Sequence, residues 1–132
     1  MKILNTTLKI VLVLIMISPI LGVLGAFSPP TPDLYNTPEA FAFIDALMAT
    51  GYINWIIAIV FALAAISIIS GRTALAAILI LPITVCIVGF HYFLDGGLFT
   101  MGSLMADVLL VINLYFLWQC RGQYRILFAR GV

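Results

Sequence analysis

The stretch Pro82–Asp95 reads PITVCIVGFHYFLD, and the rest of the chain is arranged around it. It ends a long uncharged run with His91, the single histidine of the protein, and Asp95 follows four residues later. A second uncharged run begins directly after it. The pattern predicts two apolar segments that fold back on each other, with polar side chains gathered where the chain turns.

The composition excludes a water-soluble globule. Of 132 residues, 64% are hydrophobic and 8% are charged, whereas soluble domains carry about 25% charged residues. The length suits a single domain over residues 1–132, and the apolar residues fall in long blocks. The net charge of +1 and the lack of a basic run interleaved with aromatics exclude nucleic-acid binding. The chain is predicted to be an integral protein of the cell inner membrane.

Four runs are long enough to cross roughly 30 Å of hydrocarbon. They cover residues 10–27, 52–70, 74–94 and 98–118. The connections at 71–73 and 96–97 are so short that neighbouring spans must be antiparallel. We therefore expect an all-α, multi-pass membrane protein, a four-transmembrane-helix up-and-down bundle.

The first run has a second interpretation, a cleaved signal peptide. A basic start, an apolar core and small residues near Gly25 are typical of such a peptide. The run is longer than the usual apolar core of 7–15 residues, and Gly22 with Ala26 forms a small-residue pair suited to helix packing. These two features favour a retained span.

A short helix over residues 38–50 is predicted on the outer face. Pro29, Pro30 and Pro32 keep the preceding segment from being helical. Thr37 suits the N-cap, Pro38 the first helical position and Gly51 the C-terminal cap. We expect this helix to lie over the outer end of the bundle.

The six cations predict the orientation, because Lys and Arg are retained on the cytoplasmic side. All of them fall on one side of the predicted bundle: Lys2, Lys9, Arg72, Arg121, Arg125 and Arg130. The opposite side carries acids only: Asp33, Glu39, Asp45 and Asp95. Both termini are therefore expected in the cytoplasm.

The two cysteines are not expected to pair. Cys86 and Cys120 should lie about 18 Å apart along the bundle axis, and a disulfide needs Cα atoms within about 7 Å. The sequence has no C-x-x-C motif for a thiol–disulfide relay. Cys86 is expected to be an apolar packing residue.

Three polar residues mark the predicted membrane region: His91, Asp107 and Asn113. Asp107 is predicted to lie about 14 Å deep in the last span, where an acid costs roughly 2.5–3.5 kcal/mol. Ser103, one turn earlier, is its local partner, and His91 is its nearest titratable neighbour. One interpretation is a structural polar clamp between the last two spans. The other is a ligand-binding site formed by His91, Asp95, Ser103 and Asp107.

These residues do not predict a metal site. A single histidine cannot supply the two axial ligands of a bis-histidine haem within one chain. A metal ion held by His91, Asp95 and Asp107 would still need a further ligand.

Several short motifs resemble the DoxX-like family of small four-helix membrane proteins. They are Pro38, Thr50-Gly51-Tyr52, Gly71-Arg72, Pro82, the FHYFL of residues 90–94 and the RGQYRILF of residues 121–128. The resemblance covers residues 38–128 and implies a four-helix membrane protein with kinship to DoxD, a subunit of a thiosulfate:quinone oxidoreductase. Family members often carry a Lys near the end of the first span and a Glu in the second. Here those stretches read GAF at 25–27 and ALAA at 62–65, so the charged pocket lacks its residues.

Two functions stay open. The first is a redox-associated membrane subunit that presents a quinone or another small apolar ligand to a membrane or redox protein partner. The second is a non-catalytic membrane protein that acts in assembly, packing or stress tolerance. Neither requires the chain to be an enzyme on its own or to hold a cofactor other than quinone. Contact with the lipid bilayer is common to both, and either role is compatible with an oligomer.

Overall fold

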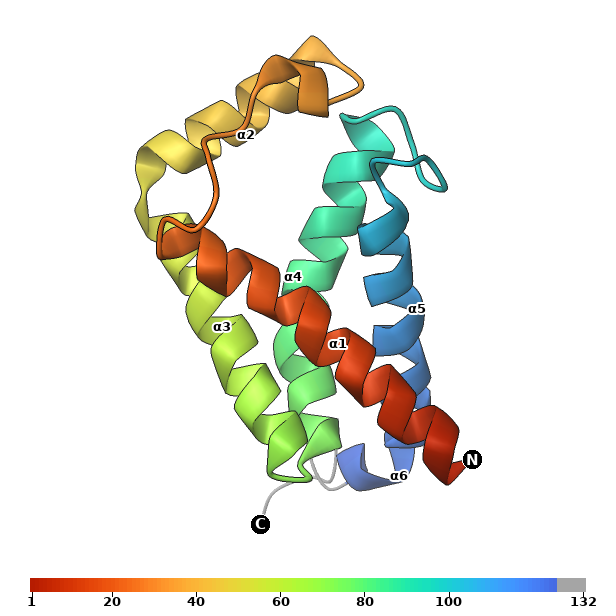
Figure 1. Ribbon diagram of the computed structural model, residues 1–132. Coiled ribbons are helices and arrows are strands. Elements are labelled where there is room, and N and C mark those ends of the chain that lie inside the picture. The colour runs from red at the N-terminus through yellow and green to blue at the C-terminus, as the bar shows by residue number, and fades with distance from the viewer. Residues whose placement is uncertain (126–132) are drawn as a thin grey trace.

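The computed structural model describes residues 1–125 as a bundle of α-helices without a strand. In chain order the elements are α1 (Lys2–Val23), the 3-10 turn η1 (Pro32–Leu34), α2 (Pro38–Thr50), α3 (Tyr52–Ile69), α4 (Thr73–Phe93), α5 (Leu104–Gln119) and α6 (Arg121–Tyr124). Helices α1, α3, α4 and α5 run up and down, and α2 lies across one end (Figure 1). Each long helix packs against the next long helix along the chain: α1 on α3, α3 on α4, and α4 on α5. The prediction of an all-α bundle is confirmed.

Three of these helices are long and apolar enough to cross a membrane: α1, α3 and α4. Their outward faces carry large apolar side chains such as Leu14, Ile59 and Val85, which are 62%, 55% and 59% exposed. Such surfaces suit contact with lipid rather than water. The bundle is that of a membrane protein.

The fourth apolar helix, α5, is shorter than the span predicted over residues 98–118. It begins at Leu104 and has 16 residues, a length of about 24 Å. Leu98, Phe99 and Met101 are apolar and therefore fall within the predicted span, but in the structure they lie in the loop before α5. Positive φ angles at Gly96, Gly97 and Phe99 turn the chain away from a helix before α5 starts.

The first helix also differs from its predicted range, 10–27. It starts at Lys2 and ends at Val23. The end is fixed by Gly25, whose φ of +80° is left-handed, and by the bond from the Ala26 N–H to the Leu21 carbonyl. Ala26 thus lies outside the helix, so the predicted Gly22–Ala26 packing pair does not form.

The predicted caps of α2 are confirmed. The Thr37 hydroxyl accepts a hydrogen bond from the Ala40 N–H at 3.1 Å, and Pro38 occupies the first helical position. Gly51, with φ +73°, ends α2 and directly precedes α3. Because the chain changes direction at this one glycine, α2 lies across the end of the bundle (Figure 1).

We name the two ends of the bundle after their short helices. The α2 end comprises residues 28–51 and 94–103; the α6 end comprises the start of α1, the turn at 70–72 and residues 120–125. Lys2, Arg72, Arg121 and Arg125 lie at the α6 end, whereas the four acids named above lie at the α2 end. The predicted separation of charges holds for these residues. Arg130 and residues 126–128 of the family-like motif lie outside the described residues.

The buried core occupies the middle of the bundle and its α6 half. It brings together two residues of α1 with three from each of the other long helices: Leu12, Met16, Phe61, Ala64, Ile68, Ala76, Ala77, Ile80, Leu109, Ile112 and Phe116. Alanines on α3 and α4 let these helices approach closely, and Phe61 of α3 and Phe116 of α5 are the largest side chains of this core. Asn113 is also fully buried there and donates to the Ala77 carbonyl at 2.9 Å.

Both cysteines are free. Cys120 is buried, but Cys86 is exposed on α4. The expectation that Cys86 packs inside the bundle was wrong, because its position on α4 faces outward rather than toward α3 or α5.

Candidate functional site

The first polar network at the α2 end is centred on Asp95, which is 2% exposed. Its Oδ1 accepts the Asn36 N–H at 2.8 Å, and its backbone carbonyl accepts from Asn36 Nδ2 at 2.9 Å. Its Oδ2 lies 2.9 Å from Nδ1 of His91, one helical turn earlier. The Thr37 hydroxyl donates to the Leu94 carbonyl. These contacts, which we call the Asp95 latch, tie the start of α2 to the end of α4.

Aromatic rings cover the latch from one side. Tyr35 packs edge-on against Phe90 with ring centroids 6.3 Å apart and against Phe41 at 6.0 Å. Burial, and after it the nearby charge of Asp95, raises the pKa of Tyr35 above its usual value. The phenol is therefore neutral at physiological pH and adds no charge beside the carboxylate.

A second network surrounds Asp107. Its Oδ2 accepts the Phe99 N–H at 2.9 Å and the Ser103 hydroxyl at 3.0 Å. Ser103 is fully buried and also accepts the Thr100 N–H at 2.9 Å. The prediction that Ser103 is the local partner of Asp107 is confirmed. The network holds the loop between α4 and α5, including Phe99 with its φ of +60°.

The predicted position of Asp107 along its helix was wrong. Because α5 begins at Leu104, Asp107 is in its first turn, about 5 Å rather than 14 Å from the helix start. There the N-terminal end of the helix dipole favours an anion. Oδ1 of Asp107 is buried and has no hydrogen-bond partner among the described residues.

His91 and Asp107 do not form a direct pair. Within residues 1–125 His91 bonds to Asp95, and Asp107 bonds to the loop and to Ser103. The two networks meet at Gly102, where a Cβ atom would lie 3.2 Å from Asn36 Nδ2 and 3.4 Å from Asp95 Oδ2. The four residues predicted as one site are thus divided between two neighbouring networks.

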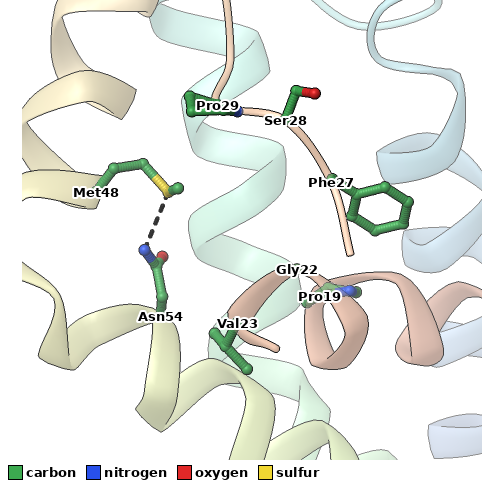
Figure 2. A pocket seen from close by; sticks show the side chains of 8 residues that line it. All are labelled: Pro19, Gly22, Val23, Phe27, Ser28, Pro29, Met48 and Asn54. Atoms are coloured by element: carbon green, nitrogen blue, oxygen red, sulfur yellow. Dashed lines mark hydrogen bonds between the residues drawn. The ribbon is translucent and has the colours of Figure 1, made fainter. Parts of the chain in front are cut away.

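A cleft of about 300 Å³ lies at the same end, between the last turns of α1, the loop that follows it, α2 and α3. It is lined by Pro19, Gly22, Val23, Phe27, Ser28, Pro29, Met48 and Asn54. Most of this lining is apolar. In Figure 2, Met48 and Asn54 face each other from α2 and α3, and Asn54 Nδ2 donates to the Met48 sulfur at 3.0 Å.

Sequence reasoning missed this cleft. Its walls come from four segments, and nothing in the linear pattern brings Pro19 close to Asn54. The usable signals were Gly22, which has no side chain to fill the space, and Pro29, which keeps the loop extended.

A second hollow, of about 450 Å³ and more open, lies at the α6 end beside Arg72 and Tyr124. Its described lining reaches Tyr124, close in sequence to residues 126–132.

The part of the chain that the structure describes contains no group of three His, Cys, Asp or Glu residues that could hold a metal ion. The cleft combines apolar walls with one amide and one hydroxyl group, and neither side chain is a strong acid or base. Comparison of the chain with protein families, with curated proteins and with solved structures gave no match.

Proposed function

We propose that this protein binds a small apolar ligand in the cleft at the α2 end and presents it to a partner in the membrane. The observation that carries the proposal is the cleft itself, a hollow with mostly apolar walls and few polar groups. Ligand sites have this character, and about 300 Å³ is at the lower end of their size range. The cleft thus suits the head of a lipid-soluble molecule such as a quinone.

The Asp95 latch is a less suitable place for the ligand. Both carboxylate oxygens of Asp95 already bond within the protein, to Asn36 and to His91. A ligand at this carboxylate would have to break the contacts that tie α2 to α4. We therefore assign the Asp95 latch a structural role, which holds α2 in place beside the cleft.

The resemblance of residues 38–128 to the DoxX-like family adds a redox-associated partner to the proposal. A quinone bound at the membrane surface could exchange electrons with such a partner, and the chain itself would need no catalytic residue. This would make it a subunit rather than an enzyme.

We further propose that the α2 end faces outward and that both termini lie in the cytoplasm. The support is the position of Lys2, Arg72, Arg121 and Arg125 at the α6 end, since basic residues are retained on the cytoplasmic side. Reporter fusions after Arg72 and after Val132 should read cytoplasmic, and one inserted between Pro29 and Pro30 should read external. A cytoplasmic reading from the fusion at Pro29 would contradict the proposed orientation.

The ligand proposal is tested by mass spectrometry of organic extracts from protein purified in mild detergent. One apolar compound should copurify in near-stoichiometric amount. A Gly22→Leu variant should carry several-fold less of it, because the new side chain occupies the cleft. Gly89→Leu is the matched control, since Gly89 is also a helical glycine and has open space around it. If no compound is enriched, the proposal fails and a non-catalytic role in assembly, packing or stress tolerance is favoured.

A further inference from the structure

We infer that Asn54 recognises the ligand through its side-chain amide, and that the ligand carries a hydrogen-bond acceptor such as a carbonyl, which replaces the Met48 sulfur. This inference rests on the proposed function and specifies the chemical class of the ligand.

The first observation is the mismatch between donor and acceptor. The Asn54 amide donates to the Met48 thioether at 3.0 Å, and a thioether sulfur is a weak acceptor. A carbonyl oxygen in the same place would make a stronger hydrogen bond. The Asn54 amide is therefore a donor that a ligand with a stronger acceptor can bond better than Met48 does.

The second observation is the mobility expected of the two partners. Asn54 lies in the first turn of α3 and Met48 in the last turn of α2, on either side of Gly51. The backbone of Asn54 is fixed by its helix, whereas Met48 has an unbranched, flexible side chain that is 45% exposed. The sulfur can withdraw from the amide without moving either helix.

The third observation is that the cleft offers few competing donors. Among its lining residues only Ser28 and Asn54 have polar side chains. In Figure 2 the Ser28 hydroxyl points away from Met48 and Asn54. One donor in apolar surroundings selects an apolar molecule that bears an acceptor, over a pure hydrocarbon and over a polar metabolite.

The experiment uses two probes of similar size, the ketone 2-undecanone and the hydrocarbon undecane, added to the full-length protein in detergent micelles. NMR signals of the Met48 methyl group and the Asn54 side-chain amide are followed during each titration. Both probes should shift the Met48 signal in a saturable way, because both can enter the cleft. Only the ketone should shift the Asn54 amide signal, and it should bind about three- to tenfold more tightly, the range expected for one net hydrogen bond.

Two variants test the assignment in opposite directions. Asn54→Leu should remove the three- to tenfold preference for the ketone over undecane. Met48→Leu should keep the ketone-induced shift of the Asn54 amide signal, because it removes only the competing acceptor. This second variant retains Asn54, so the test does not depend on the folding of the first.

The outcomes separate the inference from the function on which it rests. If neither probe moves the Met48 signal, the cleft is not a binding site and the proposed function fails with it. If both probes bind equally well and the Asn54 amide signal does not shift, the cleft binds ligands but Asn54 does not donate a hydrogen bond to them. The inference is then overturned, and the proposed function stands.

Discussion

The two halves of the bundle are held together in different ways. Toward the α6 end, apolar side chains from α1, α3, α4 and α5 form one continuous buried core. At the α2 end hydrogen bonds join loops and helix ends, the rings of Tyr35, Phe41 and Phe90 pack beside them, and a cleft remains open. Lipid gives helices little hydrophobic drive to associate, so close packing must supply the stability of the first half. The second half is held by hydrogen bonds between separate segments and contains the cleft.

The comparison predicts that the largest loss of stability comes from the core. Phe116 is fully buried, and Phe116→Ala should lower the free energy of unfolding by about 3 kcal/mol, near the lower end for such changes in soluble cores. The transfer part of that cost shrinks in lipid, but the cavity remains. Unfolding in mixed detergent micelles measures the change, and Val111→Ala, at a position 64% exposed on α5, is the control. Equal losses in the two variants would show that the core is not the stable half.

A smaller and more local effect is expected at the latch. Asp95→Ala removes the acceptors of the Asn36 N–H and of His91, at a cost of about 1–3 kcal/mol. Hydrogen exchange should rise in residues 31–50 and remain unchanged in the core of α3 and α5. Asp45→Ala, on the exposed face of α2, should change neither region. Uniformly faster exchange in Asp95→Ala would instead mean that the two halves unfold as one unit.

A pair of glycine substitutions should change stability in opposite directions. Gly102→Ala places a methyl group 3.2 Å from Asn36 Nδ2, so the latch must shift, at a cost of about 1 kcal/mol. Gly89→Ala meets no atom within 4 Å and should stabilise α4 by up to about 1 kcal/mol through helix propensity. Melting temperatures in detergent compare the two. A stabilised Gly102→Ala variant would mean that the junction of the two networks is loosely packed.

The sequence predicted those parts of the fold that depend on neighbouring residues. Thr37, Pro38 and Gly51 set the limits of α2, and Gly96 with Gly97 sets the turn after α4, because caps and turns are local. The start of α5 was missed, since Leu98 and Phe99 are apolar and only hydrogen bonds from the folded loop keep them out of the helix.

The candidate site was predicted less completely than the fold. The Ser103–Asp107 pair was found, because it spans one helical turn. The latch to Asn36 and the cleft were not found. Both depend on contacts between segments far apart in the sequence. The residue pattern of one segment does not indicate which residues of another segment will contact it.

The smallest expected effect is an absence of coupling between His91 and Asp107. A shared site would make their substitutions non-additive, by about 0.5–3 kcal/mol for residues in one network. The structure assigns them to different networks, so His91→Ala and Asp107→Asn should add to within about 0.5 kcal/mol in a double-mutant cycle. The asparagine can still accept from the Phe99 N–H, which keeps its own effect small.

A second cycle provides the scale for this result. His91→Ala combined with Asp95→Asn should be clearly non-additive, because these side chains are 2.9 Å apart. If the His91–Asp107 cycle gives a coupling as large as the His91–Asp95 cycle, Gly102 is not a boundary between two networks. The polar residues of the α2 end would then form one site, and the unpaired Oδ1 of Asp107 would be the first place to look for a ligand that joins them.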